Sequence, residues 1–154
     1  MRLEREITVP TTPTLVWQTV WDIEAVSGCV PGCGAVQELE PRRRYRATVE
    51  SRVGPFRVAM PLDVMVDRTD EGPLEIVATG RDSVLGSPVR LSLRLSIEPA
   101  DHGAKLALVV DADVGGKLAA LGQGLIERKA KEILEGWLAA LGRLIEARTD
   151  AAAI

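Results

Sequence analysis

The sequence has 154 residues, 46% of them hydrophobic and 27% charged, which is typical of one globular domain. Its formal net charge of −3 provides no basic field for nucleic-acid phosphates, and three Trp, one Tyr and one Phe are too few for a base-stacking platform. The N-terminal MRLEREITV lacks the apolar region of a secretory signal and no apolar run could cross a bilayer, so we expect a cytoplasmic protein with reduced cysteines.

A strand and two short helices are predicted first. Residues 3–9 alternate with a period of two, which indicates a strand. Thr12 suits the N-cap of a helix and Pro13 its first position, so a short helix is expected to follow. A second short helix should begin near Asp22 and must end before Pro31.

Residues 34–113 predict six antiparallel strands, because apolar residues recur there at every second position between turn-rich spacers. Pro61 within one of these runs suggests a sheet edge or a bulge. After Gly115 and Gly116 the period changes to 3.6, which predicts a long amphipathic helix over about residues 117–147. Its apolar stripe is broken around Arg128 and Lys129.

This order predicts an α+β fold in which a curved, seven-stranded antiparallel sheet wraps around the long C-terminal helix. Residues 1–148 should form a single domain, and residues 149–154 a short flexible tail. A curled sheet around a helix can leave space between the two, and we expect a binding cavity there.

Two segments carry a resemblance to a known family. VWQTVWDIEAVSGCVPGCGAVQELE resembles the opening of the CoxG-like family, which is named after a subunit of carbon monoxide dehydrogenase, and DADVGGKLAALGQGLIERKAKEIL resembles its closing signature. VESRVGPFRV is similar to the Val-Gly-Pro turn in the middle of that family. The similarity extends over about residues 5–147, and the two end motifs are its most specific parts.

The resemblance implies the helix-grip fold of the START/birch-pollen-allergen-like (SRPBCC) superfamily, with a hydrophobic cavity between sheet and helix. It also implies a bacterial-type, non-catalytic protein that binds a quinone in this cavity and associates with a molybdenum hydroxylase of the carbon monoxide dehydrogenase type. Beyond a bound quinone no cofactor is expected, and membrane contact should be peripheral at most, at the inner face.

The predicted cavity lining consists of inward residues from the strands, the short helices, the cysteine loop and the long helix. We expect no catalytic residue, because the inward strand faces are apolar and offer only the hydroxyls of Tyr45 and Ser51. The predicted lining residues are Trp17, Trp21, Val30, Tyr45, Val49, Ser51, Val53, Phe56, Val58, Met60, Leu62, Ile76, Leu91, Leu93, Leu106, Leu108, Leu118, Leu121 and Leu125.

Other reactive residues favour structural roles. Cys29 and Cys33 have three intervening residues rather than the two of a redox motif, and with a single histidine, His102, the chain offers too few ligands for a zinc site. His102 itself falls in a turn, and Asp111 and Asp113 should point to solvent. The basic segment PRRRYR at residues 41–46 predicts a solvated turn that could also contact anionic lipid or an acidic partner.

Two alternatives remain open at this stage. The first is a cyclase- or hydratase-like enzyme of the same superfamily that uses Tyr45, Ser51 or an unforeseen buried charge. The second is an assembly factor that docks on its partner dehydrogenase and leaves the cavity empty. A quinone carrier needs only apolar burial, whereas an enzyme needs acids, bases or hydrogen-bond donors in the cavity.

Overall fold

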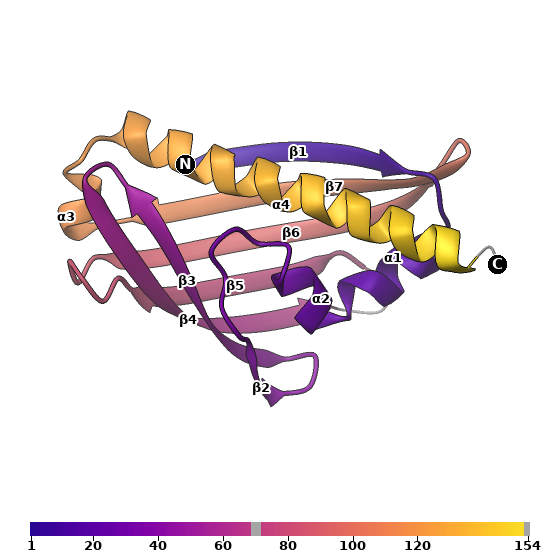
Figure 1. Cartoon of the computed structure of the whole chain (residues 1–154), viewed down its shortest axis with the longest axis horizontal. Helices are drawn as coiled ribbons and strands as arrows, with labels where there is room; N and C mark the ends of the chain where they lie inside the picture. Colours follow the sequence, from indigo (N-terminus) through magenta and orange to yellow (C-terminus); the bar gives the residue numbers. More distant parts are fainter. Residues whose placement is uncertain (69–71, 153–154) are drawn as a thin grey trace.

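A single curved sheet lies against one long helix (Figure 1). The computed structural model describes residues 1–68 and 72–152 of the chain. The elements in chain order are β1 (Arg2–Val9), α1 (Pro13–Val20), α2 (Ile23–Ser27), β2 (Gln37–Glu40), β3 (Arg44–Val53), β4 (Phe56–Arg68), β5 (Leu74–Arg81), β6 (Pro88–Ala100), β7 (Gly103–Val114), α3 (Gly116–Ala119) and α4 (Gln123–Ala152).

All seven strands form one antiparallel sheet with the order β1-β7-β6-β5-β4-β3-β2. Each strand from β2 to β7 pairs with the next one along the chain, and β1 closes the order by pairing with β7. The sheet curls around α4, while α1 and α2 lie near the C-terminal end of that helix (Figure 1). The predicted α+β helix-grip architecture is therefore confirmed.

The two short helices begin where capping side chains are available. The Thr12 hydroxyl accepts a hydrogen bond from Leu15 N at 3.3 Å, and Pro13 occupies the first turn of α1. The Asp22 carboxylate accepts one from Ala25 N at 3.4 Å and so caps α2. These bonds satisfy backbone donors that a helix start leaves unpaired, which confirms both predicted starts.

Pro61 lies at a local edge inside the sheet. The strand β4 pairs with β3 from Phe56 onward, but its pairing with β5 begins only at Leu62. On the β5 side, Pro61 therefore needs no N–H for the ladder. The buried Asp82 carboxylate accepts a hydrogen bond from Ala59 N in this unpaired stretch, at 3.1 Å.

The predicted helix over residues 117–147 is divided in the structure. A short helix, α3, ends at Ala119, and α4 begins at Gln123 after Gly122, whose φ of +105° is one that side chains rarely allow. At the other end α4 continues to Ala152, so residues 149–152 are helical rather than a tail. Thr149 Oγ1 donates to the carbonyl of Ile145, and alanines favour the last turn. Residues 153–154 of the predicted tail lie outside the described part.

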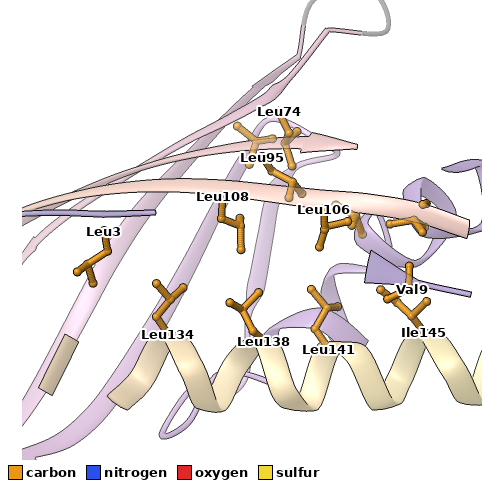
Figure 2. Packing of buried hydrophobic residues seen from close by; sticks show 14 of the residues in the cluster. Leu3, Val9, Leu74, Leu95, Leu106, Leu108, Leu134, Leu138, Leu141 and Ile145 are labelled. Atoms are coloured by element: carbon orange, nitrogen blue, oxygen red, sulfur yellow. The ribbon is translucent and has the colours of Figure 1, made fainter. Parts of the chain in front are cut away.

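The second half of α4 packs into a solid core. Leu138, Leu141 and Ile145 point toward Leu106 and Leu108 of β7 (Figure 2). Leu141 and Ile145 have no exposed surface. Burying a leucine or isoleucine side chain stabilises a fold by about 1.5–3 kcal/mol, so this region anchors the helix to the sheet. The other fully or nearly buried members are Leu3, Val9, Val16, Val20, Tyr45, Val66, Leu74, Leu95, Ala104 and Leu134.

Candidate functional site: an apolar cavity under the first half of α4

A cavity of about 390 Å³ lies between the concave face of the sheet and the first half of α4, and it is partly open to solvent. This volume is in the range of small-molecule binding sites, about 300–1,000 Å³. The lining comes from β1, α2, the loop after α2, every strand from β3 to β7, α3 and α4.

Small side chains keep this region hollow. Valines dominate the lining strands, and Ala47 and Ala112 face the same space. From α4, Ala130 contributes a methyl group where Leu138 and Leu141 fill the core farther along the helix. Because the sheet stands at a fixed distance set by the packed core, these short side chains cannot reach across it.

A second hydrophobic cluster closes the end of the cavity nearest α3. Val53 and Val58 pack with Leu118, all three more than nine-tenths buried. The buried Ser87 hydroxyl accepts a hydrogen bond from Leu118 N at 3.0 Å and fixes α3 to the loop before β6. Phe56, Leu85, Val114, Leu121, Leu125 and Ile126 pack around this cluster.

The cysteine loop covers part of the cavity by lying directly on β3. The Gly32 carbonyl accepts a hydrogen bond from Glu50 N at 2.9 Å, and Gly34 N donates to Thr48 O at the same distance. Gly32 has φ +81°, and a methyl group there would lie 1.9 Å from the Glu50 carbonyl oxygen. Glycine is thus required at this position, both for its backbone angle and for its close approach.

Two contacts frame an opening between α4 and β3. A methyl group at Gly136 would lie 3.0 Å from Pro31 Cγ, so the cysteine loop reaches α4 at that turn. A methyl group at Gly54, in the β3–β4 turn, would lie 3.2 Å from Leu125 Cδ2. The stretch of α4 between these two contacts includes Lys129, which lines the cavity and is partly exposed. On its opposite flank α4 packs along β1, where Arg5 pairs with Glu135 at 3.4 Å.

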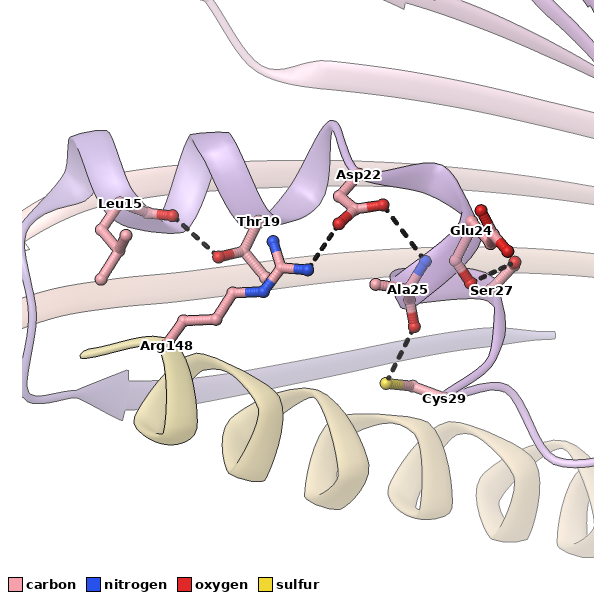
Figure 3. A network of polar contacts seen from close by, with 8 residues as sticks. All are labelled: Leu15, Thr19, Asp22, Glu24, Ala25, Ser27, Cys29 and Arg148. Carbon is pink, nitrogen blue, oxygen red and sulfur yellow. Dashed lines mark hydrogen bonds and ion pairs between the residues drawn. The ribbon is translucent and has the colours of Figure 1, made fainter. Parts of the chain in front are cut away.

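Polar contacts hold α2 against α4 (Figure 3). Arg148 near the end of α4 forms an ion pair with Asp22, the N-cap of α2. The hydrogen bond from Arg148 lowers the pKa of the Asp22 carboxyl below its ordinary value of 3.8, against the opposing effect of burial. Trp137 Nε1 also donates to the Val26 carbonyl, at 3.4 Å. The cavity wall formed by α2 is therefore fixed to the helix at two points.

The two cysteines are free and far from nucleophilic. Burial raises the pKa of both thiols, and for Cys29 this outweighs the opposing charge of Arg143. Cys29 Sγ donates to the Ala25 carbonyl at 3.5 Å, which completes the end of α2. Cys33 lines the cavity as a small, mostly apolar side chain. Both arrangements are those of structural cysteines.

Most of the strand residues predicted to line the cavity do face it. Their shared feature is the inward position on a strand that curves away from α4, or in the cysteine loop and α3. They are Val30, Tyr45, Val49, Ser51, Val53, Val58, Met60, Leu62, Ile76, Leu91, Leu93 and Leu118.

Four predicted residues belong instead to packed regions of the main core. Leu106 and Leu108 are fully buried against the second half of α4, where no space remains. Trp17 and Trp21 pack on the same core from α1 and turn their rings to arginines. The guanidinium of Arg68 lies 3.6 Å from the Trp17 ring centre, and that of Arg42 lies 4.7 Å from the Trp21 ring centre. These cation–π contacts occupy faces that a ligand would need.

Three further predicted residues, Phe56, Leu121 and Leu125, lie outside the lining because they pack in the cluster that closes the α3 end. Leu121 and Leu125 depart from the expected helical stripe since the chain breaks at Gly122. The inward period of a single long helix therefore does not apply to them.

The sequence reasoning missed the contribution of α4. Trp137 was expected to be plain core, yet it lines the cavity together with Ile126, Ala130 and Ile133. Lys129 also lines it, although the interior was expected to be free of charge. The interruption of the apolar stripe at Arg128 and Lys129 was the available signal.

The remaining candidates for chemistry lie at the surface. His102 is exposed in the β6–β7 turn with φ +63°, and Asp111 and Asp113 are exposed on β7. Within residues 1–68 and 72–152, no three His, Cys, Asp or Glu side chains come together as a metal site. No helix in the same ranges is both long and apolar enough to span a bilayer.

Solved structures share this fold at low sequence identity. A conserved protein from Geobacillus kaustophilus is 20% identical with a TM-score of 0.83, and 96% of each chain is covered. An aromatase/cyclase from Streptomyces sp. R1128 is 16% identical with a TM-score of 0.74, covering 99% of this chain and 97% of its own. A START superfamily protein from Mycobacterium smegmatis is 18% identical with a TM-score of 0.69, covering 95% and 97%.

A search of proteins with curated descriptions finds no relative of this sequence. The model of one family, CoxG, which is described as a subunit of carbon monoxide dehydrogenase, matches residues 6–145. That match includes the loop that lies on β3, the strands from β2 to β7 and the α4 residues that line the cavity. With the START-like fold around an apolar cavity, this places the chain in the CoxG family of carbon monoxide dehydrogenase proteins.

Proposed function

We propose that this protein is a non-catalytic carrier that binds a quinone or a similar apolar molecule in the cavity beneath the first half of α4. The observation that carries the proposal is the chemistry of the lining. About 390 Å³ of space is enclosed almost entirely by hydrocarbon surface, from valines, leucines and isoleucines of six strands and α4. Such a surface binds a ligand by removing apolar area from water, at about 25 cal/mol per Å².

The polar groups near the cavity favour a carrier over an enzyme. The Tyr45 hydroxyl already accepts a hydrogen bond from Arg42 N at 2.8 Å, and Tyr45 is 4% exposed. The raised thiol pKa keeps Cys33 protonated near neutral pH. Acid–base catalysis needs a positioned acid or base within reach of the substrate, and the fold's likeness to an aromatase/cyclase does not supply one.

Membership of the CoxG family supports a second part of the proposal, an association with a molybdenum hydroxylase of the carbon monoxide dehydrogenase type. The carrier would deliver or receive the quinone that such an enzyme uses. Purification from the native host with a tagged chain tests this part, and recovery of the dehydrogenase is the expected result. A carrier that acts without this enzyme would instead retain the ligand but not the dehydrogenase.

Ligand binding itself is tested with a naphthoquinone and intrinsic fluorescence. Trp137 lines the cavity, whereas Trp17 and Trp21 do not, so a bound quinone should quench mainly Trp137. We expect Ala130→Phe, which places a ring in the cavity, to abolish quenching. Ala139→Phe, at an exposed position of the same helix, should leave it intact. Equal quenching in all three proteins would contradict the proposed site.

Organic extraction of the purified protein, followed by mass spectrometry, identifies what the cavity holds. An apolar molecule present in the wild type and absent from Ala130→Phe supports the carrier function. An empty cavity in protein that also fails to bind the naphthoquinone would favour an assembly factor.

A further inference from the structure

Lys129 is an unusual member of an otherwise hydrocarbon lining. Among the described lining residues it is the only one with a charged side chain. It occupies the apolar stripe of α4 between Ile126 and Ile133, one turn away on either side, both of which line the cavity. An apolar residue would suit this position better if filling space were the only requirement.

The lysine side chain extends from the cavity to solvent. Its exposed fraction is 26%, and its Nζ lies 3.2 Å from a carboxylate oxygen of Glu132, whose side chain is 69% exposed. The methylene stem therefore contributes to the lining while the ammonium reaches the surface. Since Lys129 lies between the Gly136 and Leu125 contacts that frame the opening toward β3, its ammonium marks the mouth.

The ion pair with Glu132 is readily exchanged. Exposed pairs three residues apart on a helix contribute little, at most a few tenths of a kcal/mol to one, because water solvates both partners. A ligand that places an oxyanion at the mouth can thus take over the ammonium at small cost. The apolar remainder of the ligand would lie in the cavity.

We infer that Lys129 is a specificity-determining residue that selects amphipathic ligands with an oxyanion, such as a carboxylate, at one end of an apolar body. The inference rests on the proposed function, since it requires that the cavity accepts an apolar molecule, and it adds the chemistry of the ligand's polar end. Neutral apolar molecules of the same size enter the same cavity with lower affinity.

The test compares palmitate with hexadecanol, which share a hydrocarbon chain and differ in the charge of the head. Both are titrated below their aggregation limit, with displacement of an environment-sensitive dye as the readout. We expect the wild type to bind palmitate about fivefold more tightly, the size of one partly exposed ion pair. The preference should shrink as salt is raised.

Matched variants assign this preference to one side chain. Lys129→Met keeps the length of the stem and removes the charge, so it should bind both ligands equally, while Lys129→Arg should retain the preference. Lys131→Met removes another α4 lysine, which pairs with Glu127 at 3.2 Å and does not line the cavity, and should behave as wild type. Thermal unfolding of each variant checks that the fold is intact.

The outcomes separate this inference from the proposed function. Equal affinity of the wild type for both ligands, or the same loss in Lys131→Met as in Lys129→Met, would overturn the role of Lys129 and leave the apolar carrier standing. Failure of both ligands and of the naphthoquinone to bind would overturn the carrier together with the inference.

Discussion

The two halves of α4 face different interiors. From Leu138 onward, the helix packs leucines and isoleucines against β7 and α1 without remaining space. From Ile126 to Trp137 the same helix faces the cavity with smaller or more scattered side chains. The packed half supplies the free energy that holds the helix in place, and this support allows the other half to remain unfilled. The contrast predicts that equivalent substitutions in the two halves will have unequal effects.

The largest difference is expected for truncation of a large side chain. Leu141→Ala should reduce the free energy of unfolding by about 2–5 kcal/mol, because Leu141 is fully buried and leaves a cavity in a rigid core. Ile133→Ala should cost about 1 kcal/mol, since Ile133 already borders empty space and loses fewer contacts. Urea denaturation of both variants measures the difference. Similar losses would show that the first half of α4 is packed as tightly as the second.

Enlarging a small side chain tests the same contrast from the opposite direction. Ala104→Leu adds volume at a fully buried position of β7 and should destabilise the protein by about 1–3 kcal/mol. Ala130→Leu adds the same volume in the cavity and should be neutral or stabilising. Thermal unfolding of the two variants, without ligand, gives the comparison. A destabilised Ala130→Leu protein would mean that the cavity has no room for the larger side chain.

Two helix glycines sharpen the comparison at a smaller scale. Gly142→Ala should stabilise the protein by about 0.5–1 kcal/mol, because a methyl group there meets nothing within 4 Å and alanine favours the helix. Gly136→Ala should gain less, since its methyl group would lie 3.0 Å from Pro31 in the cysteine loop. Equal gains in thermal unfolding would show that this loop moves freely away from α4.

The smallest expected effect is the pH dependence of the contact between α2 and α4. The pKa of Asp22 is lowered in the folded state by Arg148, so its contribution to stability is present above the unfolded value and is lost as the pH falls through the folded one. Both side chains are more than a third exposed, so the contribution is under about 1 kcal/mol. Asp22→Asn retains a capping side chain and should lose less stability than wild type between neutral and acidic pH. An unchanged acid profile would contradict a stabilising role for this pair.

The sequence determined the elements and most of the strand half of the site. Alternation in β3, β4 and β6 identified inward residues such as Val49, Met60 and Leu93, because the period of two fixes which side of a strand a residue occupies. The capping residues Thr12 and Asp22 likewise placed the starts of α1 and α2. These signals are local, and local geometry does not depend on distant partners.

Only the tertiary structure decided where the interior is filled and where it is hollow. Leu91 and Leu106 are both inward-facing leucines, yet Leu91 lines the cavity and Leu106 is packed against α4. The sequence pattern cannot separate them, because the outcome depends on the distance between sheet and helix at each point. The break at Gly122 and the position of Lys129 at the mouth have the same origin. Both follow from where α4 crosses the curved sheet, which pairs residues far apart in the chain.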